Sequence, residues 1–238
     1  MHCGKLVKIV ARKKIVFVIV EGPSDDEALG LILNRYYDKN AVHVEIMHGD
    51  LTSDYSVNAN NIASKIGNIV RTFAKSNHYK CSDFQEVIHL VDMDGAYIEK
   101  ENILYSESHT KPYYTQENIL IDRPQKIVER NERKRKNLDR ICTMDKVWSK
   151  IPYHAYYMSC NLDHVLYNKL NSSDREKEED AYQFACRYKN QIPEFIKFIS
   201  KSDFSVAGDF KKSWEFIKEE KHSLERYTNI GICFKNTL

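Results

Sequence analysis

The sequence predicts an α/β protein of Rossmann-like architecture, in which a mostly parallel central sheet is flanked by helices. The first observation is an apolar, mostly β-branched run over residues 15–20, which ends at Glu21, Gly22 and Pro23. A continuous apolar run bounded by turn residues is typical of a strand buried on both faces. The second observation is that strand-like and helix-like patterns alternate as far as residue 91. Such alternation predicts parallel strands joined by helical crossovers.

The period of the apolar residues distinguishes these segments. Residues 25–37 and 58–74 carry apolar side chains at helical spacing. Residues 41–47 alternate between apolar and polar side chains, and residues 87–91, which are apolar except for His89, are predicted to form the next strand. Right-handed crossovers would put the ends of the first and third strands on the same edge of the sheet.

The second half of the chain is irregular up to residue 125 and then mostly helical. We expect a strand or edge ribbon over 113–121, a charged helix over 127–148, a strand over 153–158, and helices over 162–169, 178–199, 210–219 and 223–229, with a polar linker over 172–179. This organisation predicts an α/β domain over residues 1–170, with an insertion over about 96–150, and a helical C-terminal extension over 171–238.

Composition narrows the class of protein. With 238 residues, 42% of them hydrophobic and 29% charged, the chain is able to bury a core of its own. No window approaches ~18 uninterrupted apolar residues, so no membrane association is predicted. The six cysteines are scattered without a CxxC pair, which favours reduced thiols in a cytoplasmic protein. The net charge of +2 means that nucleic-acid binding would depend on a local patch.

Carboxylates follow two of the predicted buried strands. Glu21 ends the first strand, Asp92 and Asp94 follow the third, and Asp25 lies at the start of the first helix. Open α/β sheets bind ligands at the carboxyl ends of their strands. Clustered carboxylates repel one another unless a cation or a proton intervenes, and hard oxygen ligands suit Mg²⁺ or Mn²⁺. A lone D-x-D is a weak signal, because acids after strands also cap helices. Both patterns together favour a metal site.

Two segments resemble the paired motifs of the TOPRIM domain. They are VEGPSD, residues 20–25, and LVDMDG, residues 90–95. The resemblance covers roughly residues 13–98, with weaker similarity as far as residue 160. TOPRIM domains occur in topoisomerases, primases, OLD-type nucleases, ribosomal-RNA maturases and anti-phage effectors. The resemblance implies a Rossmann-like TOPRIM fold for the first part of this chain.

The resemblance also implies roles for particular residues. In the TOPRIM family the glutamate, here Glu21, acts as a general acid or base, and the two aspartates, here Asp92 and Asp94, hold a divalent metal. Asp25 matches an additional metal-binding acid of the OLD-type nucleases. The chain has no P-loop pattern. It is therefore similar to stand-alone RloB-like proteins and to the TOPRIM subunits of PARIS-like defence systems, which work beside a separate ATPase.

The leading hypothesis is a nuclease that uses Mg²⁺ or Mn²⁺ to hydrolyse phosphodiester bonds in RNA or DNA. The resemblance implies a toxic effector in bacterial anti-phage defence by abortive infection. The alternative is a non-catalytic regulatory or scaffold TOPRIM subunit that binds a partner ATPase or a nucleotide. A third hypothesis is phosphotransfer to, or ligation of, nucleic-acid ends. Sequence alone leaves the choice of RNA or DNA, the trigger and the oligomeric state open.

Later segments add candidate residues. Residues 157–164 resemble an RloB-type segment in which a polar turn precedes a helix with an acid, so Asp163 is a candidate metal ligand and His164 a candidate phosphate contact. Alternatively, Asn161 caps this helix and Asp163 favours its positive end. Lys221 matches, by chain order alone, the late lysine that supports the scissile phosphate in OLD-type nucleases. A solvated helix start explains that segment as well.

A run of positive charges marks the predicted helix over 127–148. Its side chains either bind the phosphates of a nucleic acid or form a solvated face; the candidates are Arg130, Arg133, Lys134, Arg135 and Lys136. Several tyrosines are able either to stack on unpaired bases or to pack in the core; they are Tyr113, Tyr114, Tyr153, Tyr156 and Tyr157.

Overall fold

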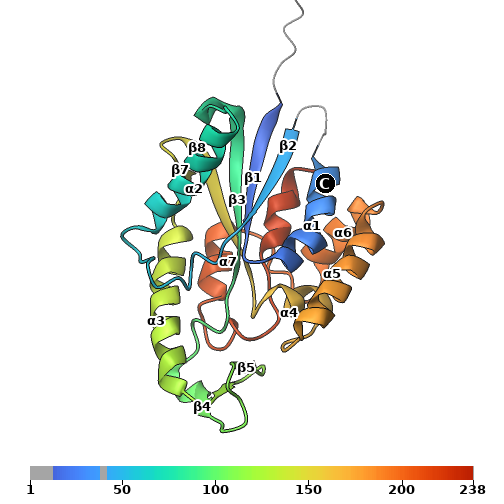
Figure 1. The fold of residues 1–238 in the computed structure, drawn as a ribbon. Helices are drawn as coiled ribbons and strands as arrows, with labels where there is room; N and C mark the ends of the chain where they lie inside the picture. The colour runs from blue at the N-terminus through green and yellow to red at the C-terminus, as the bar shows by residue number, and fades with distance from the viewer. Residues whose placement is uncertain (1–12, 38–41, 238) are drawn as a thin grey trace, which may run out of the picture.

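The central sheet of this α/β fold has the strand order β2-β1-β3-β8-β7 (Figure 1). The computed structural model describes residues 13–37 and 42–237. The strands are β1 (Lys14–Val20), β2 (Val42–His48), β3 (Phe84–Asp92), β8 (Ile151–Met158) and the short edge strand β7 (Lys146–Val147). The first four run parallel, and β7 pairs antiparallel with β8. The predicted α/β class with a mostly parallel sheet is confirmed.

Helices cover both faces of this sheet (Figure 1). They are α1 (Pro23–Tyr36), α2 (Ile62–Ser76), α3 (Pro124–Ile141), α4 (Leu162–Tyr167), α5 (Asp174–Tyr188), α6 (Ile192–Lys201) and α7 (Phe210–Phe216). Short 3₁₀ segments lie at Cys81–Asp83, Lys100–Asn102 and Ile230–Thr237. Within the described ranges, no helix is long and apolar enough to cross a membrane.

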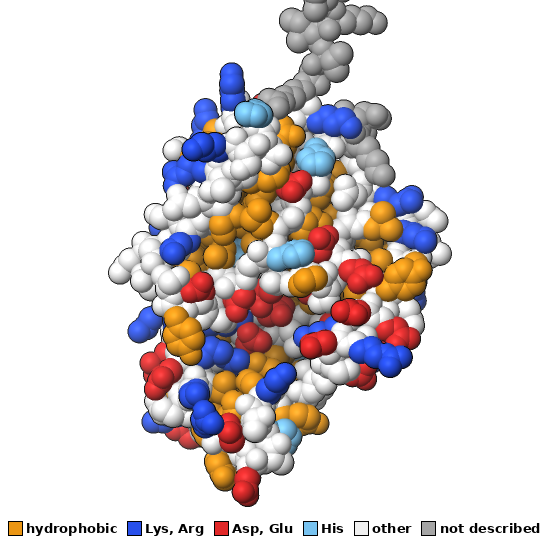
Figure 2. All heavy atoms as spheres, viewed as in Figure 1, with side chains coloured by type: hydrophobic (Ala, Val, Ile, Leu, Met, Phe, Trp, Pro, Cys, Tyr) orange, Lys and Arg blue, Asp and Glu red, His pale blue; other side chains and the backbone are white. Residues whose placement is uncertain are grey.

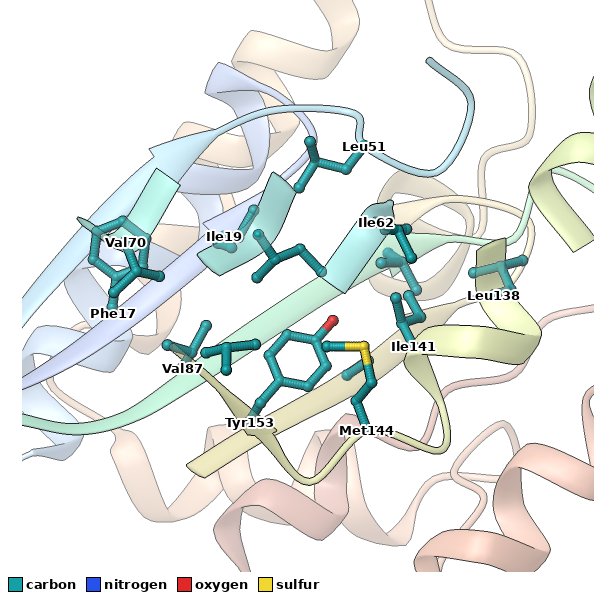
Figure 3. Packing of buried hydrophobic residues seen from close by; sticks show 14 of the residues in the cluster. Phe17, Ile19, Leu51, Ile62, Val70, Val87, Leu138, Ile141, Met144 and Tyr153 are labelled. Atoms are coloured by element: carbon teal, nitrogen blue, oxygen red, sulfur yellow. The ribbon is translucent and has the colours of Figure 1, made fainter. Parts of the chain in front are cut away.

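β1 shows why its sequence is a continuous apolar run. Successive side chains of a strand point to opposite faces. Ile15, Phe17 and Ile19 pack on one face with α2, α3 and α7, and the residues between them pack on the other face with α1, α5 and α6. Figure 3 shows the first of these clusters, in which Phe17 lies beside Val70 of α2, and Leu138 and Ile141 of α3 belong to the other end of the same cluster. Burial on both faces fixes β1, and therefore Glu21, at the centre of the fold.

A second, three-stranded sheet lies beyond the carboxyl edge of the central sheet (Figure 1). It consists of β4 (Ile103–Tyr105), β5 (Tyr113–Tyr114) and β6 (Ile119–Ile121), in the order β4-β6-β5. Its isoleucines pack with Ile127 of α3 and with Leu224 from the C-terminal region. The edge ribbon expected over 113–121 is therefore present as the β5–β6 pair, and the insertion has a small core of its own.

Several element boundaries differ from the sequence prediction. The strand expected over 41–47 is β2; residue 41 lies outside the described residues. The helix expected over 127–148 ends at Ile141, because the chain then turns into β7. The segment 172–179 is not a linker, since α5 begins at Asp174 behind the cap of Ser173, whose hydroxyl accepts a hydrogen bond from the Glu176 N–H.

Two predictions for the C-terminal region were also wrong. The single helix expected over 178–199 is two helices, because Pro193 lies in the first turn of α6 and cannot continue a preceding helix. Residues 223–229 are not helical. Their backbone instead bonds to the end of β8, where the Ser159 N–H donates to the Tyr227 carbonyl over 2.9 Å.

Candidate active site

Side chains and backbone groups from three parallel strand ends meet at the carboxyl edge of the sheet. Glu21 follows β1, and Asp92 is the last residue of the neighbouring strand β3. The Asp92 N–H donates to Glu21 Oε1 over 3.1 Å. Asp92 Oδ1 in turn accepts from the N–H of Leu162, the first residue of α4 after β8, over 3.1 Å. The parallel sheet therefore brings these acids together, as the sequence predicted for this edge.

A tight turn directs Asp94 into the same site. Asp94 has a φ of 50° and Gly95 a φ of 67°, so both residues are in the left-handed region. Glycine is required at the second position, because a Cβ there would lie 2.6 Å from the Leu224 side chain. The Gly95 N–H donates to the Ser223 carbonyl over 3.0 Å, which ties the turn to the C-terminal region. Thus the glycine of the D-x-D-G pattern has a defined structural role.

Lys134 of α3 lies inside this acid cluster. Its side chain is fully buried, and its ammonium forms an ion pair with Asp94 and lies 3.5 Å from Glu21 Oε1. Burial by itself would lower the pKa of Lys134, but the charges of Asp94 and Glu21 outweigh it and raise that pKa. Lys134 is therefore a permanent cation between two acids from different strand ends.

The acids respond differently to burial. Burial raises the pKa of Glu21 to about 8, against the opposing charge of Lys134. Burial also raises the pKa of Asp92 well above its usual value, and the negative charges of Glu21 and Asp25 add to this rise. For Asp94, the charges of Lys134 and Arg130 outweigh burial and lower the pKa. The positive charges of the site, on Lys134 and Arg130, thus act mainly on Asp94.

The position of Lys134 was missed because it belongs to a run of charges that indicates a solvated face. The helical period contains the missing signal. The buried positions of α3 recur at intervals of three or four residues, and one of them is the lysine; this stripe comprises Ile127, Asn131, Lys134, Leu138 and Ile141. Because the stripe faces the core, a lysine on it needs an anionic partner.

The other basic residues of α3 mostly contact the protein itself. Arg130 donates to the Asp94 carbonyl over 2.7 Å and to the Tyr114 hydroxyl over 2.8 Å. Arg133 donates to a carbonyl of the 50–61 loop and stacks 4.1 Å over the Tyr55 ring. The Arg135 Nε donates to the Ala96 carbonyl over 3.2 Å.

Among the five predicted phosphate-binding residues, only Lys136 is exposed. The structure therefore brings Arg130 and Lys134 into the acid site, whereas Arg133 and Arg135 donate to backbone carbonyls of neighbouring loops.

Asp25 and Asp163 lie on the α1 and α4 side of the site. Asp25 Oδ2 accepts from the Gly22 N–H over 2.9 Å, so this acid also caps α1. Asp163 lies 3.5 Å from the ammonium of Lys177 of α5. Burial raises the pKa of both carboxyls, and the charge of Asp163 adds to the rise at Asp25.

Two remaining candidates near α4 and in the C-terminal region have other contacts. Asn161 caps α4, since its Oδ1 accepts from the His164 N–H over 3.0 Å. The His164 residue is 1% exposed and its Nδ1 accepts from the Cys160 N–H, so its ring faces the interior. The Lys221 ammonium lies 3.7 Å from Glu117, and among the described residues it forms no ion pair with the acid cluster.

Of the five tyrosines that were candidates for stacking on bases, three are core residues and two lie near the acid site. Tyr153, Tyr156 and Tyr157 are at most 5% exposed, so they cannot stack on a bound base. The hydroxyl of Tyr114 donates to Asp94 Oδ1 over 3.3 Å. Tyr113 is 41% exposed and remains available to a ligand.

Sequence reasoning also missed Asp50, which follows β2. Its negative charge contributes to the raised pKa of Glu21 and to that of Lys134. Its carboxylate accepts from the N–H groups of Thr52 and Ser53, which holds it in the turn after the strand. The signal for it was similar to that for Glu21: an acid two residues after the end of a strand of a parallel sheet. Figure 2 shows Asp and Glu side chains gathered across the middle of this face.

The donor chemistry of the cluster suits a hard divalent cation. Carboxylate oxygens are the ligands that Mg²⁺ and Mn²⁺ prefer, and Mg²⁺ is often held by one or two carboxylates and its own waters. In the part of the chain that the structure describes, no group of three or more His, Cys, Asp or Glu side chains is arranged to hold a metal ion. Asp92, whose half-buried carboxylate lacks the close ion pair that Asp94 has, is the residue best suited to bind a cation.

The arrangement unites acids that favour a cation or a proton, a carboxyl that titrates near neutral pH, and a buried ammonium. Such a set of groups is able to bind a phosphate ester through a cation and to move a proton beside it. A scan against models of protein families, a search of curated proteins and a search of solved structures each found no match for this chain.

Proposed function

We propose that this chain is a divalent-metal-dependent nuclease that hydrolyses phosphodiester bonds in RNA or DNA. The observation that supports the proposal best is the direct hydrogen bond from the Asp92 N–H to Glu21, which joins acids from two neighbouring strand ends. The Lys134 ammonium lies 3.5 Å from the same Glu21 oxygen. The residues that carry the TOPRIM resemblance are thus the ones that meet in space.

Glu21 is the residue for proton transfer in this proposal. Its Oε1 is held by the Asp92 N–H and by the Lys134 ammonium, which gives the carboxyl a defined orientation. Its pKa of about 8 makes the ionised and the protonated forms both accessible near neutral pH. A general acid or base works best with a pKa close to the operating pH.

Asp92 is the principal residue for holding Mg²⁺ or Mn²⁺, and Asp25 lies close enough to raise its pKa. When bound, the cation would polarise a phosphoryl oxygen and lower the pKa of an attacking water. Asp92 is itself oriented by the Leu162 N–H. Asp163 is a weaker candidate ligand, because it is already paired with Lys177.

Lys134 and Gly22 also contribute to the proposed site, the first through its charge and the second through the space beside it. Lys134 offsets the negative charge of Asp94 and Glu21. A phosphate that approaches these two acids is therefore repelled less strongly. A Cβ at Gly22 would meet no atom within 4 Å, so there is open space directly beside Glu21. This space gives a substrate room to approach the carboxyl.

The test is cleavage of total RNA and plasmid DNA by the purified chain, with Mg²⁺ and with EDTA. We expect cleavage only with Mg²⁺, and roughly a 10²- to 10⁴-fold loss of rate in Glu21→Gln, as for removal of a general acid or base. Asp92→Asn should lose cleavage too. Asp145→Asn is the matched control, because that carboxylate is 84% exposed. Wild-type rates in Glu21→Gln or Asp92→Asn would refute the proposal.

The setting of this activity rests on the resemblance alone. It suggests a toxic effector of bacterial anti-phage defence in the cytoplasm, working beside a separate ATPase. Incubation of the chain with candidate ATPases, followed by the cleavage assay, tests this setting.

One observation favours the alternative of a non-catalytic TOPRIM subunit. Lys134 already supplies a positive charge between Glu21 and Asp94, as a metal ion would. In a regulatory or scaffold subunit this ion pair would only stabilise the fold. Calorimetry with Mn²⁺ and Mg²⁺ separates the two hypotheses: the nuclease binds a cation and loses this binding in Asp92→Asn, whereas the scaffold binds none and degrades nothing.

A further inference from the structure

A polar pocket of about 400 Å³ adjoins the acid cluster. We call it the Tyr113 pocket and define it by the lining residues that matter below, which are His109, Lys111, Tyr113, Tyr114, Asn171 and Lys177. It lies between the small sheet of the insertion and the segment that leads from α4 to α5. Its volume is within the range of sites for small molecules or single nucleotides.

The pocket shares walls with the acid cluster. Tyr114 lines the pocket, and its hydroxyl donates to Asp94. Lys177 lines it as well, and its ammonium pairs with Asp163. A ligand that fills the pocket therefore lies next to the groups proposed to act on a phosphodiester.

The charge of the pocket is opposite to that of the cluster. Its lining contains Lys111, Lys177 and His109 but no Asp or Glu. Lysine side chains contact the phosphates of nucleic acids without regard to sequence. A backbone phosphate is thus attracted to the pocket itself, although the acids next to it repel an anion in the absence of a cation.

The pocket also offers an aromatic surface that is held in place. The ring of Tyr113 lies 4.6 Å from the ring of His109, centroid to centroid. His109 Nδ1 is in turn 2.7 Å from the Ser106 hydroxyl. The Asn171 amide bonds to both the N–H and the carbonyl of Tyr114, over 2.8 Å each, so it ties β5 to the opposite wall.

We propose that the Tyr113 pocket binds an unpaired nucleotide next to the cleaved phosphodiester, in single-stranded RNA or DNA. This proposal rests on the proposed nuclease function. The base stacks on Tyr113, and Lys111 and Lys177 contact the adjacent phosphate. Bases inside a duplex are stacked on each other and cannot offer a free face, so the pocket selects single-stranded substrates.

The test is fluorescence anisotropy with the full chain and labelled oligonucleotides: single-stranded RNA, single-stranded DNA and a duplex of the same sequence. Ca²⁺ replaces Mg²⁺, and the length of each probe is checked after the titration. We expect at least one single strand to bind more tightly than the duplex. Tyr113→Ala should weaken this binding by roughly 5- to 100-fold, the range for loss of one stacked base. The two single strands tell which sugar the pocket accepts.

Matched variants keep the test independent of folding. Tyr113→Phe retains the ring and should bind as the wild type does. Tyr105→Ala removes a tyrosine of the same small sheet that is 68% exposed and does not line the pocket, so its affinity should stay within about 2-fold of wild type. Lys111→Ala should weaken binding, whereas Lys100→Ala, a lysine that is 75% exposed, should not.

Three outcomes would overturn the proposal: equal affinity of Tyr113→Ala and wild type, tighter binding of the duplex, or no binding of any oligonucleotide. Failure of the pocket and failure of the nuclease are distinguishable. If Asp92→Asn abolishes cleavage while Tyr113→Ala changes neither affinity nor rate, the pocket proposal is wrong and the nuclease stands. If single strands bind through Tyr113 but nothing is cleaved, the nuclease proposal is wrong.

Discussion

Replacing Glu21 by glutamine should stabilise the fold while it slows cleavage by orders of magnitude. The Glu21 carboxyl has a pKa of about 8 in the folded chain, against 4.5 without its surroundings. The folded state therefore binds more protons than the unfolded state between these two values, and stability falls as pH rises through that window. At pH 7 this difference in protonation lowers the free energy of unfolding by about 3 kcal/mol.

Glutamine avoids this cost but weakens the contact with Lys134. The Glu21 side chain is also 17% exposed, which reduces the penalty for its charge. We therefore expect a net gain of about 1–2 kcal/mol at pH 7, or a rise in Tm of roughly 2–8 °C for a chain of this size. The gain should be small near pH 5, where the carboxyl of the unfolded chain has only begun to ionise. It should grow up to about pH 8, where the folded-state carboxyl ionises too, and stay constant above that pH.

The assay is thermal unfolding of wild type and Glu21→Gln in EDTA at several pH values. Asp94→Asn is the matched comparison, because Lys134 contacts both acids but the pKa of Asp94 is lowered. A lowered pKa stabilises the fold above its usual value of 3.8, so Asp94→Asn should lower Tm at neutral pH. The reasoning is refuted if Glu21→Gln lowers Tm to the same extent at every pH.

Three further changes test other parts of the site and core. Lys134→Met should cost about 3–5 kcal/mol in EDTA, because it leaves buried carboxylates without their cation, and added Mg²⁺ should restore part of the Tm. Equal Tm values with and without Mg²⁺ would count against a metal site. Gly95→Ala should lower the free energy of unfolding by about 2–4 kcal/mol in urea titrations, since the new Cβ would lie 2.6 Å from Leu224 at a positive φ. Gly22→Ala is its control and should cost about 1 kcal/mol or less. His89 is buried with a pKa lowered to about 4, so acidification from pH 7 to 5 should remove about 2 kcal/mol of stability through this residue. His89→Gln should lose that part of the pH dependence in urea titrations, and an unchanged pH profile would contradict it.

The edge of the sheet was predictable from sequence because its strands are buried on both faces. Such strands appear as uninterrupted apolar runs, and their ends are marked by the first polar residue. Glu21 and Asp92 lie at two such ends, and parallel pairing of β1 with β3 brings them together. Asp50 follows the more polar strand β2, where the boundary is less sharp, so its part in the site was not predicted.

The segment 223–229 was harder to predict, because distant parts of the chain supply several of its hydrogen-bond partners. Residues 223–229 have helical composition but bond to the turn after β3 and to the end of β8. The Ser159 hydroxyl, for example, lies 2.6 Å from the carbonyl oxygens of both His222 and Glu225 and shares its one proton between them. Local propensity is a weak predictor where distant segments supply the partners of the backbone.

The insertion, which reads as an irregular and basic stretch, supplies the groups that balance the acids of the sheet. A parallel sheet can bring several carboxylates to one edge, but each acid that it buries there needs a cation or a proton. Lys134 meets this need for Asp94 from the core-facing stripe of α3, and Tyr114 of β5 adds a hydrogen bond to the same carboxylate. Asp92 receives no such partner from the insertion, and its pKa is raised instead. The insertion thus leaves one strand end without a close cation, and this is the position where an external cation would gain most.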